Sequence, residues 1–83
     1  MGLTVVYKET AAPALRRLRD SDRAAFARVR AITSALADNP YPDSSVPWGR
    51  SGYYRLHAGD LRVLYEVDEK AQAVYILSVG QII

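Results

Sequence analysis

The chain has 83 residues, with 11 Lys or Arg against 9 Asp or Glu, so its formal net charge at pH 7 is only +2. That length predicts a single domain, residues 1–83, with a small core. It contains no cysteine and one histidine, which argues against disulfides, thiol chemistry and a structural zinc site. No apolar run approaches the roughly 20 residues of a membrane span, and the first residues lack a signal-peptide pattern. We therefore expect a cytoplasmic protein with no membrane partner, no metal and no cofactor.

The first half of the chain predicts one strand followed by two helices. Residues 3–8 are β-branched and aromatic, as is typical of a strand. Thr10 is a candidate N-cap for a first helix, in which apolar residues recur at helical spacing. Asp22 offers a new N-cap for a second helix over residues 23–37, which the Asn-Pro pair at 39–40 ends. The two helices should form a hairpin.

The second half predicts a long loop and then three strands. Residues 41–52 contain several prolines and glycines, and a loop of this length is often functional. Segments rich in Tyr, Leu and Val follow at 53–57, 60–67 and 73–79. The predicted fold is therefore α+β, with an N-terminal strand, a helical hairpin and a three-strand antiparallel meander. Together the strands should form a twisted four-strand sheet.

The hairpin of the first two strands in this meander is the most informative feature. If Ala58 and Gly59 form its turn, Arg55 lies directly opposite Arg62. Like charges in that position repel by a few tenths to about 1 kcal/mol. An anion between the two guanidinium groups offsets this repulsion, and phosphate matches their fork of donors.

Alternation along these strands separates an apolar face from a mixed, basic face. Tyr53, Arg55 and His57 share the basic face with Arg62, while the apolar face should pack on the helices. The basic face is therefore a candidate binding surface. The alternative is that both arginines are solvated, or pair with Glu66 or with a carboxylate of a helix.

Four other side chains are candidates for the same surface. Trp48 has a ring that can stack on a base, or it fills a gap between loop and sheet. Arg50 either reaches the basic face or is an ordinary loop charge. His57 is the only side chain with an unperturbed pKa near neutrality, so it is a candidate general acid or base; the alternative is an exposed histidine at a strand end. Tyr53 is a candidate for base stacking or proton transfer.

Residues 54–68 read Tyr-Arg-Leu-His-Ala-Gly-Asp-Leu-Arg-Val-Leu-Tyr-Glu-Val-Asp. This run resembles the RelE/ParE superfamily of type II toxin–antitoxin toxins, whose pattern is an aromatic, Arg, Leu, a Gly-Asp turn, an aromatic and Arg-Val-hydrophobic-Tyr-Glu. Leu61 stands where the second aromatic is usual. The strand at 74–80 and the helical hairpin are similar too, and the resemblance implies a helical hairpin packed on a twisted antiparallel sheet.

RelE-like members of this superfamily cut mRNA in the ribosomal A site without a metal. The 2′-hydroxyl attacks the adjacent phosphate, and basic residues of the sheet stabilise the transition state. Arg62 matches the strand arginine that contacts the scissile phosphate, and Arg55 matches a basic position on the preceding strand. The predicted catalytic residues are Arg62, Arg55 and His57, and the predicted RNA-binding residues are Arg50, Arg55, Arg62, Tyr53 and Trp48.

The resemblance also implies partners. One is mRNA on the ribosome. The other is a cognate antitoxin, which would form with this chain a hetero-oligomer that binds operator DNA. We expect a segment of the antitoxin to cover the apolar rims of the helices and sheet and to block the basic face.

One part of the superfamily pattern is missing. Its nucleases follow the last strand with His or Lys, then Arg, and a Tyr several residues on. Here Gln81 and Ile82 occupy the first two positions, and the Tyr has no counterpart. This departure leaves an alternative open: a non-enzymatic, ParE-like inhibitor of DNA gyrase, or a degenerate toxin that only binds its antitoxin.

Overall fold

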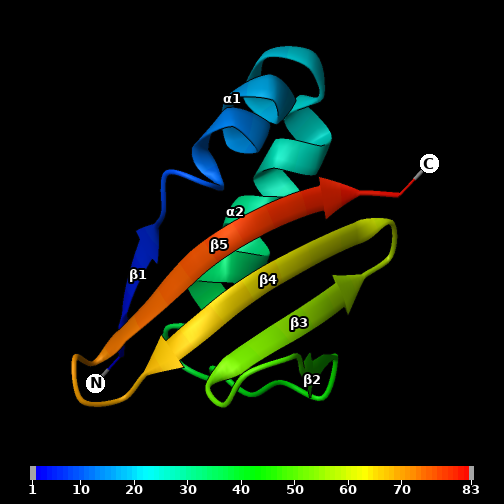
Figure 1. Ribbon diagram of the computed structural model, residues 1–83. Coiled ribbons are helices and arrows are strands. Elements are labelled where there is room, and N and C mark those ends of the chain that lie inside the picture. The colour runs from blue at the N-terminus through cyan, green and yellow to red at the C-terminus, as the bar shows by residue number, and fades with distance from the viewer. Residues whose placement is uncertain (1, 83) are drawn as a thin grey trace.

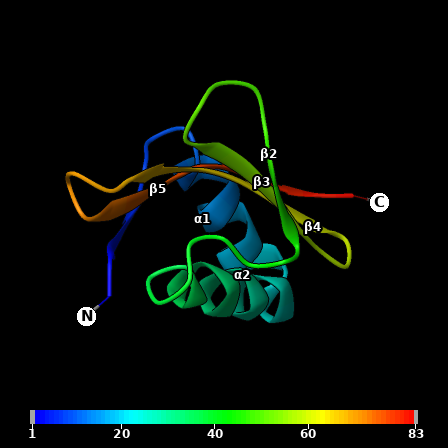
Figure 2. The same cartoon turned by 90° about the horizontal axis from the view of Figure 1, so that it is seen from below.

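In the computed structural model, which describes residues 2–82, two helices cover one face of a five-stranded sheet (Figure 1). The elements in chain order are β1 (Thr4–Tyr7), α1 (Ala12–Ser21), α2 (Arg23–Ala35), β2 (Ser45–Pro47), β3 (Tyr53–Ala58), β4 (Leu61–Asp68) and β5 (Ala73–Gln81). The order across the sheet is β1-β5-β4-β3-β2. Strand β1 runs parallel to β5, and the other neighbours are antiparallel. Figure 2 shows both helices on the same side of the sheet, which leaves the other side open.

The two helices begin in different ways. The N-cap of α1 is Ala11, which has no side chain that can cap the helix. The Thr10 hydroxyl donates to the carbonyl of Leu77 instead. The predicted Thr10 cap is therefore wrong. At α2 the prediction is confirmed, because the Asp22 carboxylate accepts a hydrogen bond of 3.1 Å from the backbone N–H of Ala25. Helix α2 ends at Ala35, two residues earlier than the sequence pattern predicts.

Replacing Asp22 with alanine is expected to lower the free energy of unfolding by about 1 kcal/mol, because α2 loses its N-cap. Urea denaturation followed by circular dichroism measures this loss. The matched control is Asp20→Ala, which removes a carboxylate that is 69% exposed and whose only ion pair within residues 2–82 is with the neighbouring Arg19. The control should change stability by less than about 0.5 kcal/mol. Equal losses in the two variants would mean that charge, rather than capping, causes the effect.

The sheet has one strand more than predicted. Residues 45–47, inside the expected loop, pair with β3 as the short edge strand β2, with Val46 opposite Arg55. Proline lacks an N–H for a strand ladder, but it is tolerated on a sheet edge. The prolines of this segment therefore obscured a strand that the edge position allows.

The turn of the β3–β4 hairpin differs from the prediction by two residues of register. Ala58 pairs with Leu61, so the turn is Gly59-Asp60 rather than Ala58-Gly59. Gly59 has a φ of +62°, at the first turn position, where type II′ hairpins prefer glycine. The predicted pairing of Arg55 with Arg62 is therefore wrong. A shift by two residues keeps every side chain on its face, so the face assignment is nevertheless confirmed.

The core lies between the helices and the apolar face of the central strands. Tyr65 at its centre is fully buried, stacks on Tyr54 at 5.8 Å between ring centroids, and donates from its hydroxyl to the carbonyl of Pro40 at 2.7 Å. The other large buried side chains of the sheet are Leu56, Leu61, Val63, Val67, Val74, Ile76 and Val79. Tyr75 is not part of this core: it is half-buried, with the Lys8 ammonium 4.6 Å from its ring centroid.

Candidate functional site

The side of the sheet opposite the helices brings all the predicted site residues together. We call this surface the open face and define it by Trp48, Arg50, Tyr53, Arg55, His57 and Arg62. Its central members come from β3 and β4, where His57 lies directly opposite Arg62. Arg55 is the diagonal neighbour of Arg62, because it pairs with Leu64 two residues further along β4. Diagonal neighbours in antiparallel strands are about 7–8 Å apart, within reach of long side chains.

Arg55 is held against the sheet by Trp48. Its guanidinium carbon lies 3.8 Å from the centroid of the Trp48 ring, which is a close cation–π contact. The Arg55 Nε is buried and has no hydrogen-bond partner within the described residues. Trp48 is 46% exposed, so it does not fill a gap between loop and sheet. Instead it offers one surface to Arg55 and leaves part of the ring accessible to a ligand.

The loop between β2 and β3 carries two of these side chains onto the open face. Its ends are tied by a hydrogen bond of 2.9 Å from the Trp48 N–H to the Tyr53 carbonyl. Gly49 and Gly52 have φ of +72° and +90°, which residues with a Cβ adopt at a cost. This tight path leaves the Arg50 guanidinium 5.7 Å from the centroid of the Tyr53 ring. Arg50 therefore reaches the open face.

His57 and Arg62 form an accessible pair on the open face. Both are exposed, and within residues 2–82 neither Arg62 nor Arg55 forms an ion pair, so the suggested pairing with Glu66 or a helix carboxylate is absent there. Desolvation on the sheet surface, then the charges of Arg62 and Arg55, lower the pKa of His57 below its ordinary value of 6.5. The imidazole is therefore mainly neutral at pH 7, the form that can accept a proton.

A hydrogen-bond network on the helix side fixes the turn that joins the strands of His57 and Arg62. Arg28 of α2 donates from Nη2 to the Asp60 carboxylate at 3.0 Å and to the Ala58 carbonyl at 3.2 Å. Gln81 donates from Nε2 to the same carboxylate at 2.9 Å. The hydrogen bonds from Gln81 and Arg28 lower the pKa of Asp60.

The sequence did not reveal this network, because its members are far apart along the chain. Its only signal was the Gly-Asp pair at the turn. At position 81 the superfamily's nucleases have His or Lys, but here the Gln81 side chain is bound to the Asp60 carboxylate. The Ile82 N–H also donates to the Asp60 carbonyl, at 2.7 Å.

Two further findings concern residues 2–82. They contain no cluster of three or more His, Cys, Asp or Glu side chains arranged to hold a metal ion. None of their helices is long and apolar enough to cross a membrane.

The fold is similar to solved toxins of toxin–antitoxin systems. A chain of the RelBE2 toxin–antitoxin complex of Mycobacterium tuberculosis is 26% identical, with a TM-score of 0.83, over 98% of this chain and 99% of that chain. A chain of the archaeal RelE–RelB complex of Pyrococcus horikoshii is 25% identical, with a TM-score of 0.82, over 98% and 96% of the two chains. The isolated RelE toxin of Escherichia coli shares the fold at 17% identity, with a TM-score of 0.82 over 98% and 85%.

The family assignment follows from the sequence as well. No curated protein sequence matches the chain. The family model described as "ParE toxin of type II toxin-antitoxin system, parDE" matches residues 5–81. The chain therefore belongs to the ParE toxin family and is a toxin of a type II toxin–antitoxin system, which confirms the resemblance to the RelE/ParE superfamily.

Proposed function

We propose that this toxin is a ribosome-dependent mRNA endoribonuclease that binds RNA on its open face. The observation that carries the proposal is the grouping of Arg62, His57 and Arg55 on one accessible surface, with no carboxylate paired to either arginine within residues 2–82. Two guanidinium groups with unused donors suit a phosphate, and a neutral imidazole beside them suits proton transfer. The choice of mRNA as the substrate follows the resemblance of residues 54–68 to RelE-like toxins.

The chemistry that these residues can perform is a transesterification, in which the neighbouring 2′-oxygen replaces the 5′-oxygen at phosphorus. His57 accepts the proton of the 2′-hydroxyl, whose oxygen forms a bond to phosphorus. The bond from phosphorus to the 5′-oxygen breaks, and that oxygen takes a proton from water. Arg62 and Arg55 stabilise the negative charge that develops on the non-bridging oxygens. The exposed part of Trp48 stacks on a base and helps to position the strand.

The test is cleavage of a defined mRNA on purified ribosomes, measured as single-turnover rates across pH 5–8. We expect cuts at fixed codon positions that leave a 2′,3′-cyclic phosphate. Because imidazole can act as a general base only in its unprotonated form, the rate should fall as the pH drops through the pKa of His57, below 6.5. His57→Gln should lower the rate by about 10²–10⁴ and remove this acid limb. An unchanged rate and acid limb in His57→Gln would exclude His57 as the base.

A second candidate function is inhibition of DNA gyrase without catalysis. The observation that favours it is the end of β5, where Gln81 is bound to Asp60 and Ile82 occupies the position of the expected arginine, so neither of these two positions carries a cation. The family model that matches is also that of ParE toxins. A gyrase supercoiling and DNA-cleavage assay separates the two functions. Gyrase-dependent DNA breaks without cleavage of ribosomal mRNA would replace the nuclease proposal.

We further propose that a cognate antitoxin neutralises this toxin and forms with it a hetero-oligomer that binds operator DNA. The similar chains from Mycobacterium tuberculosis and Pyrococcus horikoshii come from structures of toxin complexes with their antitoxins. Copurification of the toxin with the product of the adjacent small gene tests this partner. A toxin that shows no affinity for that product would contradict the assignment.

A further inference from the structure

We infer that a hydrogen-bond network at the β3–β4 turn positions His57 beside Arg62 for mRNA cleavage. This turn network consists of Arg28, Asp60 and Gln81. The inference rests on the proposed function, because it assigns positioning residues to the same site. It also gives Gln81 a role at a position where the superfamily's nucleases have His or Lys.

The relative position of His57 and Arg62 depends on the strands that carry them. Within residues 2–82 neither side chain forms a hydrogen bond or an ion pair. Arg62 pairs with Gly80 of β5, which has no side chain, and a Cβ there would have no atom of a more distant residue within 4 Å. The residue opposite Arg62 on β5 therefore does not hold the guanidinium group.

No backbone hydrogen bond joins His57 directly to Arg62. The His57 N–H points away from β4 and donates to the Ser44 carbonyl at 3.2 Å. The two residues therefore form a non-hydrogen-bonded pair, the kind in which facing side chains lie closest. The alignment of such a pair depends on the pairs that flank it. On the side of the turn, the flanking pair is Ala58 with Leu61, the last pair of the hairpin.

The turn network holds this last pair and the turn beside it. Arg28 donates from Nη2 to the Ala58 carbonyl at 3.2 Å and to one oxygen of the Asp60 carboxylate at 3.0 Å. Gln81, which pairs with Leu61 on β5, donates to the other carboxylate oxygen at 2.9 Å. These bonds from Gln81 and Arg28 lower the pKa of Asp60, so the carboxylate stays ionised between pH 5 and pH 8. The network therefore ties the hairpin end to both α2 and β5.

Loss of one network side chain should loosen the turn without unfolding the hairpin. The hydrogen bond of 2.7 Å from the Ile82 N–H to the Asp60 carbonyl joins backbone atoms, so it remains in every side-chain variant. A displacement of about 1 Å between reacting groups can lower a rate by about 100-fold. The network therefore affects the reaction through the placement of the imidazole and the guanidinium.

The test is Gln81→Ala, which removes one hydrogen bond of the network and changes no charge. In NMR spectra we expect a weaker Overhauser effect between the His57 ring and the Arg62 side chain. The pKa of His57 should rise toward 6.5, because the Arg62 charge that helps to lower it lies further away on average. The single-turnover rate constant at saturating toxin should fall about 10- to 100-fold, while the half-saturating concentration changes by less than about twofold.

The matched control is Gln72→Ala. The Gln72 side chain donates to the Glu69 carbonyl at 2.7 Å in the β4–β5 turn, at the opposite end of β4. The control therefore also removes a glutamine hydrogen bond from a hairpin turn, and it should change neither the His57 signals nor the rate. Unchanged His57 signals in Gln81→Ala, or an equal fall of the rate in Gln72→Ala, would overturn the inference.

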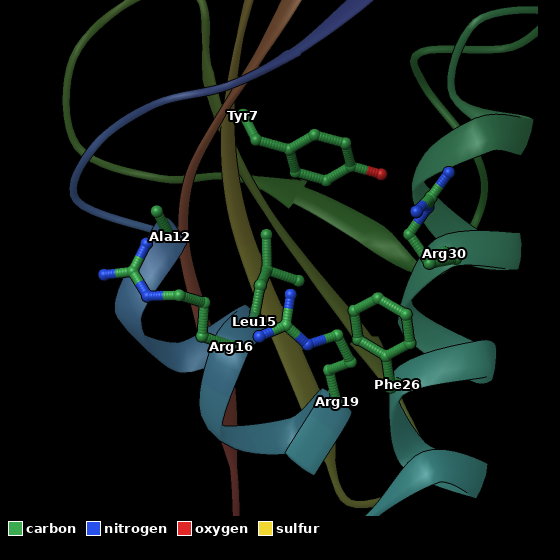
Figure 3. Close-up of a pocket in the computed structure, with 7 residues that line it drawn as sticks. All are labelled: Tyr7, Ala12, Leu15, Arg16, Arg19, Phe26 and Arg30. Atoms are coloured by element: carbon green, nitrogen blue, oxygen red, sulfur yellow. The ribbon is translucent and has the colours of Figure 1, made fainter.

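A second pair of variants tests the contribution of α2. Arg28→Ala should lower the rate constant as Gln81→Ala does. Its control, Arg30→Ala, removes the same charge from the same helix. Arg30 forms no ion pair within residues 2–82 and lines a cavity between the two helices and Tyr7 of β1 (Figure 3). Equal rates in the two variants would exclude Arg28 as a positioning residue.

The two proposals can fail separately. A wild-type toxin that does not cleave mRNA would contradict the nuclease proposal alone, because the pKa of His57 and its Overhauser effect to Arg62 need no substrate. Those two measurements would then still decide whether the turn network positions the pair. Cleavage by the wild type with no change of rate in Gln81→Ala or Arg28→Ala would overturn only the inference about the network.

Discussion

Replacing Tyr65 with alanine is expected to lower the free energy of unfolding by about 3–5 kcal/mol, as for other large aromatic residues removed from a core. Tyr65 has no exposed surface, and its ring stacks on that of Tyr54. A domain of this length has a total stability of only about 4–12 kcal/mol. Urea denaturation should therefore show a variant that is close to unfolding, or largely unfolded, in water.

Tyr65→Phe is the control that separates packing from hydrogen bonding. It keeps the ring and removes the hydrogen bond of 2.7 Å from the hydroxyl to the Pro40 carbonyl. The expected loss is about 1–2 kcal/mol, because a partly buried acceptor is left without its donor. A loss in Tyr65→Ala no larger than this would mean that the ring contributes little and that the core forms elsewhere.

The faces of the sheet could be predicted from the sequence because a strand has a repeat of two residues. Tyr65 and Arg62 lie an odd number of positions apart on β4, so they point to opposite sides whatever the register of the hairpin. The register itself depends on the turn, and both Ala58-Gly59 and Gly59-Asp60 provide a glycine. The resulting error was two residues, which exchanges pairing partners but leaves the composition of the open face intact.

The contacts that complete the candidate site were not predictable, because they join residues without a shared periodic pattern. The stacking of Arg55 on Trp48 depends on β2, an edge strand that its proline concealed. The hydrogen bonds of Arg28 and Gln81 to Asp60 join α2, the hairpin turn and the end of β5. Only the packed fold brings these three segments to one place.

Replacing Arg62 with alanine is expected to lower the rate constant of mRNA cleavage by about 10²–10³, the usual effect of losing one donor to the transition state. The pKa of His57 should rise at the same time. Desolvation, then the charges of Arg62 and Arg55, lower that pKa, and the substitution removes the arginine with the larger effect on it. The acid limb of the rate should therefore move to higher pH. Single-turnover cleavage on ribosomes and NMR titration of His57 measure the two effects.

Arg62 is a better residue for this test than Arg55, because removing Arg55 also exposes the ring of Trp48 and changes the loop around it. Arg62 is exposed and forms no hydrogen bond or ion pair through its side chain within residues 2–82, so its loss should change stability by less than about 0.5 kcal/mol.

Arg23→Ala, on the helix side, removes the same charge and should retain cleavage. Arg62→Lys keeps the charge but not the fork of donors, so an intermediate rate would assign bidentate phosphate binding to Arg62. Wild-type cleavage by Arg62→Ala would remove Arg62 from the mechanism.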